Sequence, residues 1–258
     1  MPLTHNDGVR LIALAAFPDV HAGDDLAQTI VERCRATGNV PLDGDVVVVA
    51  QKVVSKAEDR YVDLARVEPS GKARALSSTT GKDARLVEVI LGESRRVVRA
   101  VRDVLIVEHR LGFVMANGGV DQSNVGTGPD ERVLRLPSDP DSSAARLRDA
   151  LEQAFAVRLG VVISDSFGRP WRLGTVGVAL GVAGLPALVD LRGTDDRYGR
   201  RLAATLVGHA DEIASAASLV MGQSDEGQPV VIVRGLLARA PASTAAALLR
   251  PAHEDLFR

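Results

Sequence analysis

The sequence predicts an α+β fold with mixed sheets and helices. Three short runs rich in valine and isoleucine, residues 45–50, 161–163 and 230–233, have the composition of buried strands. Amphipathic segments with capping residues lie between them and predict helices. Residues 137–142 are rich in Pro, Ser and Asp. We therefore expect one unit, residues 1–258, made of two interlocked subdomains with a soft boundary at that segment.

Composition excludes several classes of protein. The 258-residue chain is 46% hydrophobic and 25% charged, and a chain of this length buries roughly three quarters of its unfolded surface. An aromatic content of 3% and a net charge of −2 argue against general binding of nucleic acid. Because the chain has neither a basic leader nor an apolar run of ~18 residues, we expect a cytoplasmic protein with no membrane partner.

The first elements follow from an apolar run and a capping pattern. Residues 9–16 predict a strand, and residues 26–35 predict a helix that Asp24 or Asp25 caps and Gly38 closes. The only cysteine of the chain lies on the apolar spacing of this helix. We favour a core residue over a catalytic thiol at that position, because free cysteine is often simply buried.

The middle of the chain combines helical spacing with two short apolar runs. Residues 70–102 predict mostly helix, including an arginine cluster that we interpret as a solvated helix face or a subunit contact rather than an anion site. Residues 143–158 predict a further helix, with Asp141 or Ser142 as its cap. Between these two helices, residues 103–108 and 112–116 predict two short strands joined by a turn.

The last third is built from small residues and short segments. Residues 176–182 are small and apolar, and the glycines around them limit this region to short elements. Residues 202–207 predict a strand. Alanine-rich spacing predicts a helix over residues 210–220, and residues 244–250 predict a closing helix.

The most informative stretch is residues 160–174, GVVISDSFGRPWRLG. Its apolar run stops at Asp165 before a Phe-Gly-Arg-Pro turn signal, so we expect Asp165 at the carboxyl end of a strand, where open α/β sheets bind ligands. A carboxylate beside hydroxyls suits a hard cation, while Arg169 and Arg172 suit phosphate or carboxylate. The alternative is a surface turn whose Arg and Asp pair with each other.

Three other polar segments belong to the same hypothesis. Residues 116–126 form a Gly-rich loop with Asp121, which together with Asp165 could neutralise a divalent ion on nucleotide phosphates, although Asn-Gly-Gly is also a common turn. Lys52, Ser55 and Lys56 follow a buried strand and suit phosphate oxygens; the alternative is a solvated edge with a Lys56–Glu58 charge pair. Residues 221–228 form a third polar loop. The histidines show no metal-ligand spacing, and the sequence has no Walker-type P-loop.

Eight motifs occur along the chain in order: FPDV with AGDDL, VVSKAE, NGGVDQSN, ISDSFGRPWRLG, DRYGR, ADEIA, MGQSDEG and VIVRG. Together they resemble the coenzyme F420-0:L-glutamate ligase family over about residues 9–257. The resemblance implies an enzyme that adds L-glutamate to the deazaflavin precursor F420-0 and uses GTP, divalent magnesium or manganese, and potassium. It also implies a homodimer with the active site in a groove near the subunit contact. Some relatives carry a second, flavin-binding domain, and we expect no part of it within residues 1–258.

The same resemblance assigns residues by position. The implied divalent-metal ligands are Asp121, Asp165, Ser166 and Gln223. The implied GTP contacts are Phe17, Pro18, Asp19, Val20, Gln51, Lys52, Lys56, Asn124, Met221, Gly222, Gln223, Ser224, Asp225, Glu226, Gly227 and Gln228. Two places depart from the family pattern. Archaeal members have a small hydroxyl pair in place of Gln51 and Lys52, and an acidic residue in place of Gln223.

The implied chemistry is an amide synthesis driven by phosphoryl transfer. GTP would phosphorylate the carboxylate of F420-0, and the glutamate amine would attack the acyl phosphate, once or more than once. Asp121 and Asp165 would hold the metal, Lys56 would offset phosphate charge, and Arg169 or Arg172 would receive the anionic precursor or glutamate. Phosphoryl transfer depends on positioning and charge neutralisation, so no nucleophilic side chain is needed.

Two alternatives remain at this point. The first is another nucleotide-driven carboxylate–amine ligase or kinase on the same scaffold, acting on a different acceptor. The second is a non-catalytic protein that binds deazaflavin or nucleotide. A pair of metal-binding aspartates, Asp121 and Asp165, favours catalysis, because a simple binding protein needs no metal pair.

Overall fold

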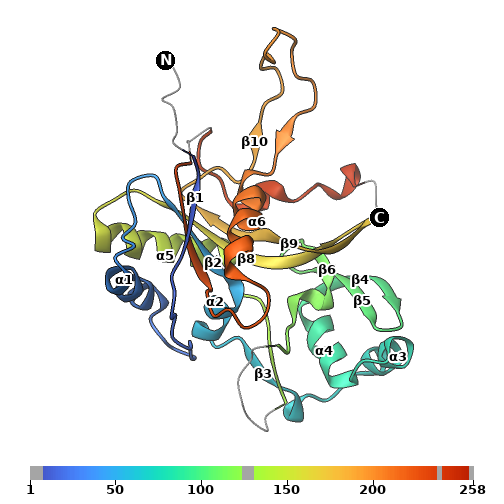
Figure 1. The fold of residues 1–258 in the computed structure, drawn as a ribbon. Helices are drawn as coiled ribbons and strands as arrows, with labels where there is room; N and C mark the ends of the chain where they lie inside the picture. The colour runs from blue at the N-terminus through green and yellow to red at the C-terminus, as the bar shows by residue number, and fades with distance from the viewer. Residues whose placement is uncertain (1–7, 124–130, 237–239, 256–258) are drawn as a thin grey trace.

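The computed structural model describes residues 8–123, 131–236 and 240–255, and it is built on a five-stranded sheet (Figure 1). The strand order is β1 (Arg10–Ala13), β12 (Val230–Arg234), β2 (Val46–Ala50), β8 (Gly160–Arg169) and β9 (Arg172–Ala183). Strands β2 and β8 pair in parallel, and every other neighbour pair in this sheet is antiparallel. The α+β prediction is confirmed.

Both faces of the central sheet are buried, which explains the unbroken valine runs. Val47 and Val49 of β2 pack toward helices α1 (Leu26–Thr37) and α5 (Pro140–Phe155). Val46 and Val48 face the opposite layer, which contains α6 (His209–Met221). Since successive side chains of a strand point to opposite faces, four consecutive valines supply two cores at once, and each buried valine contributes roughly 1.5 kcal/mol or more.

Capping residues define the helix ends. Asp25 caps α1 by accepting a hydrogen bond from Gln28 N at 3.0 Å, and Gly38 closes it at φ 71°, as predicted. Helix α5 differs from the prediction, because Asp139 is its cap and accepts from Ser142 N at 3.0 Å. Pro at the first helical position suits that start, since its missing N–H would be unpaired there in any case.

A smaller unit lies between β2 and α5 in the sequence. Its helices are α3 (Gly71–Thr80) and α4 (Ala84–Gly92), and its three-stranded sheet contains β4 (Ser94–Val101), β5 (Val104–His109) and β6 (Val114–Ala116). The strands at 104–109 and 114–116 are as predicted, but the helix expected up to residue 102 ends at Gly92. The arginine-rich segment is strand β4, because antiparallel pairing with β5 satisfies its backbone while its arginines point to solvent.

Strands β8 and β9 are longer than expected. Most of the turn predicted at residues 167–170 is still strand, because β8 runs to Arg169 and the turn lies at residues 170–171. The region expected to hold only short elements is the 12-residue strand β9. Pairing between the two strands outweighs the weak strand propensity of glycine. Gly177 and Gly181 are needed there, because a Cβ would collide with the carbonyl of Ala214 in α6 or of Pro140 in α5. Small residues let helices approach both faces of this hairpin.

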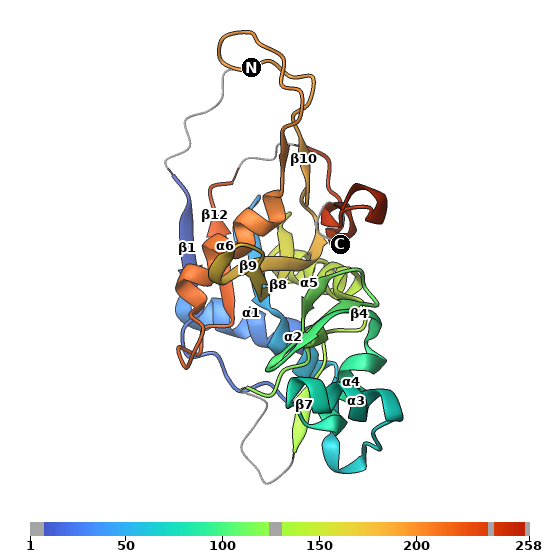
Figure 2. The ribbon, with the colours of Figure 1, turned by 90° about the vertical axis from the view of Figure 1, so that its right-hand side faces the viewer.

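The remaining elements are short. A two-stranded ladder joins β3 (Tyr61–Asp63) to β7 (Arg132–Leu134), and β10 (Val189–Asp190) pairs with β11 (Leu206–Val207) at the base of an arm that projects from the body (Figures 1 and 2). The strand expected at 202–207 is thus only its last two residues, and the closing helix expected at 244–250 is the 3-10 turn η3 (Ala245–Leu248). Other short helices are α2 (Gln51–Ala57), η1 (Leu64–Arg66), η2 (Asn117–Gly119) and η4 (Ala252–Glu254). No helix in the described ranges has the length and apolarity to cross a membrane.

Candidate active site

A cleft of about 1090 Å³ opens where the central sheet meets α2 and the loop after α6. Four sequence-distant segments line it, at residues 17–22, 50–56, 164–166 and 221–229. These segments carry most of the side chains that the motifs single out. The cleft lining includes Phe17, Pro18, Asp19, Val20, Gln51, Lys52, Lys56, Asp165, Ser166 and each residue from Met221 to Gln228.

Asp165 lies where the parallel pairing of β8 ends. The last parallel pair is Ala50 with Ser164, so Asp165 stands at the carboxyl edge of that pairing although its strand continues to Arg169 in the hairpin with β9. Its Oδ1 accepts a hydrogen bond from Ser166 N at 2.8 Å. The prediction that β8 ends at Asp165 is wrong, because the strand continues to Arg169. Asp165 nevertheless lies at the edge of the parallel pairing, the kind of position where ligands bind.

Asp121 reaches the same place from the smaller unit. It follows a tight turn in which Asn117, Gly118 and Gly119 all have positive φ, and a Cβ on Gly119 would collide with the side chain of Leu136. Its backbone forms a two-way bridge with Leu134, at 2.9 and 2.8 Å. Glycine is required at that turn, which explains the paired glycines in the motif.

Lys52 forms an ion pair with Asp121, and its charge also acts on Asp165. Lys52 Nζ lies 2.7 Å from Asp121 Oδ2 and 2.9 Å from Ser123 Oγ, and Asp121 Oδ1 accepts from Ser123 N at 2.8 Å. Burial raises the pKa of Asp121, but hydrogen bonds from Lys52 and Ser123 hold that pKa below its usual value. The sequence alone did not indicate that Lys52 pairs with Asp121.

The charge on Asp165 is poorly compensated. Burial raises the pKa of Asp165 to about 6; its bond from Ser166 N–H lowers it, the charge of Asp121 raises it, and Lys52 lowers it. Asp121 and Asp165 therefore repel each other across one shared cation. Such a pair is a favourable place for a further positive charge.

The basic side of the cleft comes from α2. Burial lowers the pKa of Lys56, which the charge of Asp19 partly restores and that of Lys52 lowers further. The alternative of a Lys56–Glu58 pair is wrong, because Glu58 binds Arg146 at 2.9 Å instead. Gln51 is fully buried and its Oε1 accepts from Ser55 Oγ at 2.8 Å, so that hydroxyl supports the helix rather than facing the cleft.

The loop after α6 folds back on itself. Glu226 Oε2 accepts a hydrogen bond from Ser224 N at 2.8 Å, and backbone hydrogen bonds lower the pKa of Glu226. Gly222 ends α6 with φ 74°. Gln223 lies in the lining beside these residues. The backbone N–H groups of the loop are thus directed at its own Glu226 carboxylate, while its polar side chains line one wall of the cleft.

Not every predicted site residue lines this cleft. Asp121 is outside the lining and is joined to it through its ion pair with Lys52. Arg169 and Arg172 lie opposite each other in the strand register at the far end of the β8–β9 hairpin. Neither belongs to the lining. Asn124 lies outside the described residues. Conversely, Tyr61 and Arg132 line the cleft from the β3–β7 ladder, and the Arg132 guanidinium lies 5.5 Å from the centre of the Tyr61 ring. No local motif marks these two residues, because only the ladder brings them together.

The donor set suits a hard divalent cation. In the described part of the chain, no group of three His, Cys, Asp or Glu side chains is arranged to hold a metal by itself. Two carboxylates with a neighbouring hydroxyl are nevertheless the usual protein share of a magnesium site completed by substrate phosphates and water. The ammonium of Lys52 against Asp121 shows that this carboxylate already accepts a cation. Asp121, Asp165 and Ser166 therefore fit such an ion.

Comparison with known proteins identifies the family of the chain. Residues 15–235 match the family described as F420-0:Gamma-glutamyl ligase. Among similar proteins, each called coenzyme F420:L-glutamate ligase, that of Methanothermobacter thermautotrophicus is 47% identical over 97% of this chain and 99% of its own length. That of Methanopyrus kandleri is 48% identical, covering 93% of each chain, and that of Methanocaldococcus jannaschii is 45% identical over 84% of this chain and 85% of its own. The chain belongs to the F420-0:gamma-glutamyl ligase family.

Proposed function

We propose that the protein is a ligase that joins L-glutamate to the deazaflavin precursor F420-0 through a new amide bond. The observation that carries the proposal is that Lys52 and Asp165 line one cleft, that Asp121 pairs with Lys52, and that the charges of Asp121 and Lys52 both act on Asp165. The chain is also 47% identical over nearly its whole length to a protein named for this ligation. Repelling carboxylates beside lysines suit a reaction in which negative charge is moved and neutralised.

The energy source in this proposal is GTP. Its γ-phosphoryl group passes to a carboxylate oxygen of F420-0, and GDP leaves. The amine of glutamate then attacks the acyl carbon, loses a proton and expels phosphate, which leaves the amide. Such a reaction needs no protein nucleophile. The only cysteine supports this, because Cys34 is fully buried in the core and burial raises the pKa of its thiol to about 11.

The chain's own residues have distinct roles in this scheme. Asp121 and Asp165 would hold magnesium or manganese, with Ser166 and Gln223 as further oxygen donors, and the ion would offset phosphate charge. Lys56 and Lys52 would contact phosphate oxygens. Residues 17–20 and 221–228 would form the walls around the nucleotide. Potassium and Asn124 also belong to the proposal, through the family resemblance.

A homodimer is part of the same proposal. Two apolar side chains at the β8–β9 hairpin end, Trp171 and Leu173, are 88% and 98% exposed. Exposed apolar groups of this size are typical of association surfaces. In a dimer, Arg169 and Arg172 at that hairpin end would lie near the subunit contact, where they would bind the anionic precursor or glutamate. Size-exclusion chromatography with light scattering tests this, and a wild-type monomer at micromolar concentration would contradict it.

Mass spectrometry tests the function directly. F420-0 is incubated with the protein, L-glutamate, GTP and manganese, and GDP release is followed in parallel. We expect the precursor to gain one or more glutamyl units with release of one GDP for each. GDP without glutamyl product would favour a ligase or kinase with another acceptor. Folded protein that yields neither product would favour a non-catalytic binding protein.

A further inference from the structure

Lys52 supplies the cation that Asp121 binds in this structure. Its Nζ lies 2.7 Å from Asp121 Oδ2 and 2.9 Å from Ser123 Oγ. The side chains of Lys52 and Asp121 are each 28% exposed, and Lys52 lines the cleft, so the pair can be reached from the cleft. Because water screens an ion pair that is partly exposed, such a pair is weak. An ion of higher charge can therefore displace the ammonium from Asp121.

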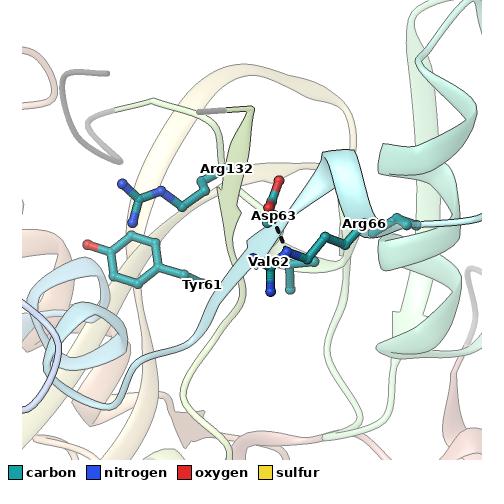
Figure 3. Close-up of a pocket in the computed structure, with 6 residues that line it drawn as sticks. Tyr61, Val62, Asp63, Arg66 and Arg132 are labelled. Atoms are coloured by element: carbon teal, nitrogen blue, oxygen red, sulfur yellow. Dashed lines mark ion pairs between the residues drawn. The ribbon is translucent and has the colours of Figure 1, made fainter. Parts of the chain in front are cut away.

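Asp121 is fixed by its backbone, whereas the ammonium of Lys52 stands on a flexible stem. The backbone of Asp121 forms hydrogen bonds in both directions with Leu134 of β7, at 2.9 and 2.8 Å. Strand β7 pairs in turn with β3, in the ladder that Figure 3 shows. The four-carbon stem of lysine has several rotatable bonds. A change of partner at this carboxylate should therefore move Lys52 and leave Asp121 in place.

A second partner for Lys52 would lie on the side of the cleft where α2 carries another lysine. Lys56 follows Lys52 by four residues in α2, so the two side chains share one face of the helix, and both line the cleft. Burial lowers the pKa of Lys56, and the charge of Lys52 lowers it further, because the two ammonium groups repel each other. A phosphate group bound beside Lys56 would accept hydrogen bonds from both lysines and relieve this repulsion.

Asp165 also favours the exchange of the ammonium for an ion of higher charge. Burial raises the pKa of Asp165 and the charge of Asp121 adds to the increase, while the charge of Lys52 offsets only part of it. The hydrogen bonds of Lys52 go to Asp121 and Ser123. A divalent ion would bring two positive charges to the pair of carboxylates, where Lys52 brings one.

We propose that Lys52 couples the binding of metal to the binding of nucleotide. Without metal, its ammonium holds the cation position at Asp121. Lys52 gives up this position to a divalent ion and turns to the phosphate oxygens of the nucleotide. The inference rests on the proposed function, which supplies both ligands. Each ligand should then tighten the binding of the other, because coupling between two sites is reciprocal.

Manganese binding without nucleotide tests the first half of this exchange. The dissociation constant of Mn²⁺ is measured by electron paramagnetic resonance of the free ion for wild type, Lys52→Met and Lys52→Gln, and circular dichroism checks that each variant is folded. The matched control is Lys56→Met, because it removes the same charge from the same helix face but leaves the ion pair of Lys52 with Asp121.

We expect Lys52→Met to bind Mn²⁺ about fivefold more tightly than wild type, because no ammonium competes for Asp121. Lys52→Gln should lie between the two, since an amide can still donate a hydrogen bond to the carboxylate. Lys56→Met should change the dissociation constant less. Equal effects of Lys52→Met and Lys56→Met, or weaker binding of Mn²⁺ by Lys52→Met, would overturn the inference.

GTP binding in EDTA tests the second half. Asp121→Asn removes the ionic partner of Lys52 and should release the ammonium toward the nucleotide. Calorimetric titration should show that Asp121→Asn tightens GTP binding about fivefold when Lys52 is present. In the Lys52→Met background the gain should be about twofold or less, because only the repulsion by Asp121 is lost. An equal gain in both backgrounds would overturn the inference.

The two proposals can fail separately, because these titrations contain neither F420-0 nor glutamate. Amide formation by the wild type is measured in its own assay. A wild type that forms the amide, with Lys52 variants that behave like the control, would contradict only the coupling by Lys52. A protein that meets both binding expectations but forms no amide would contradict only the proposed function.

Discussion

Two carboxylates of this protein, buried Glu93 and half-buried Asp165, have opposite electrostatic environments. Glu93, in the smaller unit, is within 3.4 Å of Arg60, Arg110, Arg135 and His109. Burial alone raises the pKa of Glu93, but contacts with His109 and Arg110 bring it down to about 2. Asp165 shares one lysine with Asp121, and its pKa is raised to about 6. A carboxylate surrounded by cations stabilises the fold, whereas one left short of cations is ready to bind one.

The largest expected effect is on catalysis. Asp165→Asn keeps the shape of the side chain and removes its charge, so GTP-dependent glutamate addition should fall by at least about 100-fold. The matched control is Asp211→Asn. Burial also raises the pKa of Asp211, which accepts from Ala179 N at 2.9 Å on the same hairpin but lies outside the cleft. GDP release and product mass are measured for both variants; full activity of Asp165→Asn would contradict its role.

The next effect is on stability. Glu93→Gln leaves three arginines around an uncharged amide, and we expect a loss of about 3 kcal/mol in the free energy of unfolding. Urea denaturation followed by circular dichroism measures this. Asp165→Asn should not be destabilised in the same assay, because it removes a charge that folding disfavours. A loss below about 1 kcal/mol for Glu93→Gln would show that its ion pairs contribute little.

Metal binding should distinguish the role of Asp165 from that of Glu93. At a manganese concentration about 100 times its dissociation constant, the apo protein should gain about 2.7 kcal/mol of stability. That gain should disappear in Asp165→Asn and Asp121→Asn, while Glu93→Gln should retain it despite its lower starting stability. Thermal melts with and without manganese provide the comparison. An undiminished shift in Asp165→Asn would place the ion elsewhere.

The smallest effect is on the dependence of stability on pH, measured in EDTA. The pKa of Asp165 is raised from 3.8 to about 6 in the folded protein, so its ionisation opposes folding fully above about pH 6, and this penalty shrinks as the pH falls through 6 and is lost only below 3.8. The stability advantage of Asp165→Asn over wild type should therefore shrink between pH 8 and pH 5. Urea midpoints at each pH measure it, and a constant difference would indicate that Asp165 has an ordinary pKa.

Glu93 should show the reverse trend in the same titration. Its pKa falls from 4.5 to about 2 in the folded protein, so its stabilising contribution is complete above about pH 4.5 and is lost as the pH drops toward 2. The cost of Glu93→Gln should accordingly stay constant from pH 8 to pH 5 and decrease below pH 4.5. A cost that changes between pH 8 and pH 5 would mean that another group responds to the substitution.

The sequence was informative wherever a structural signal is local. Valine runs predicted strands β2 and β12, and Asp25 with Gly38 predicted both ends of α1, because burial on two faces and helix capping depend on neighbouring residues. The motifs also indicated most of the segments that line the cleft. Each of them carries its polar side chains within a few residues of a strand or helix end, so that no long-range information is needed to find them.

Only the tertiary structure decided which residues meet. The sequence predicts helix where β4 lies and only short elements where β9 lies, and both predictions are wrong. The two strands are stabilised by hydrogen bonds to β5 and β8, which local propensity does not reveal. The contact of Lys52 with Asp121 and the stacking of Arg132 on Tyr61 join residues about 70 positions apart. The charge balance of Asp165 depends on the first contact, and the cleft wall formed by Tyr61 and Arg132 depends on the second. Contacts between distant segments create both, and no local pattern encodes them.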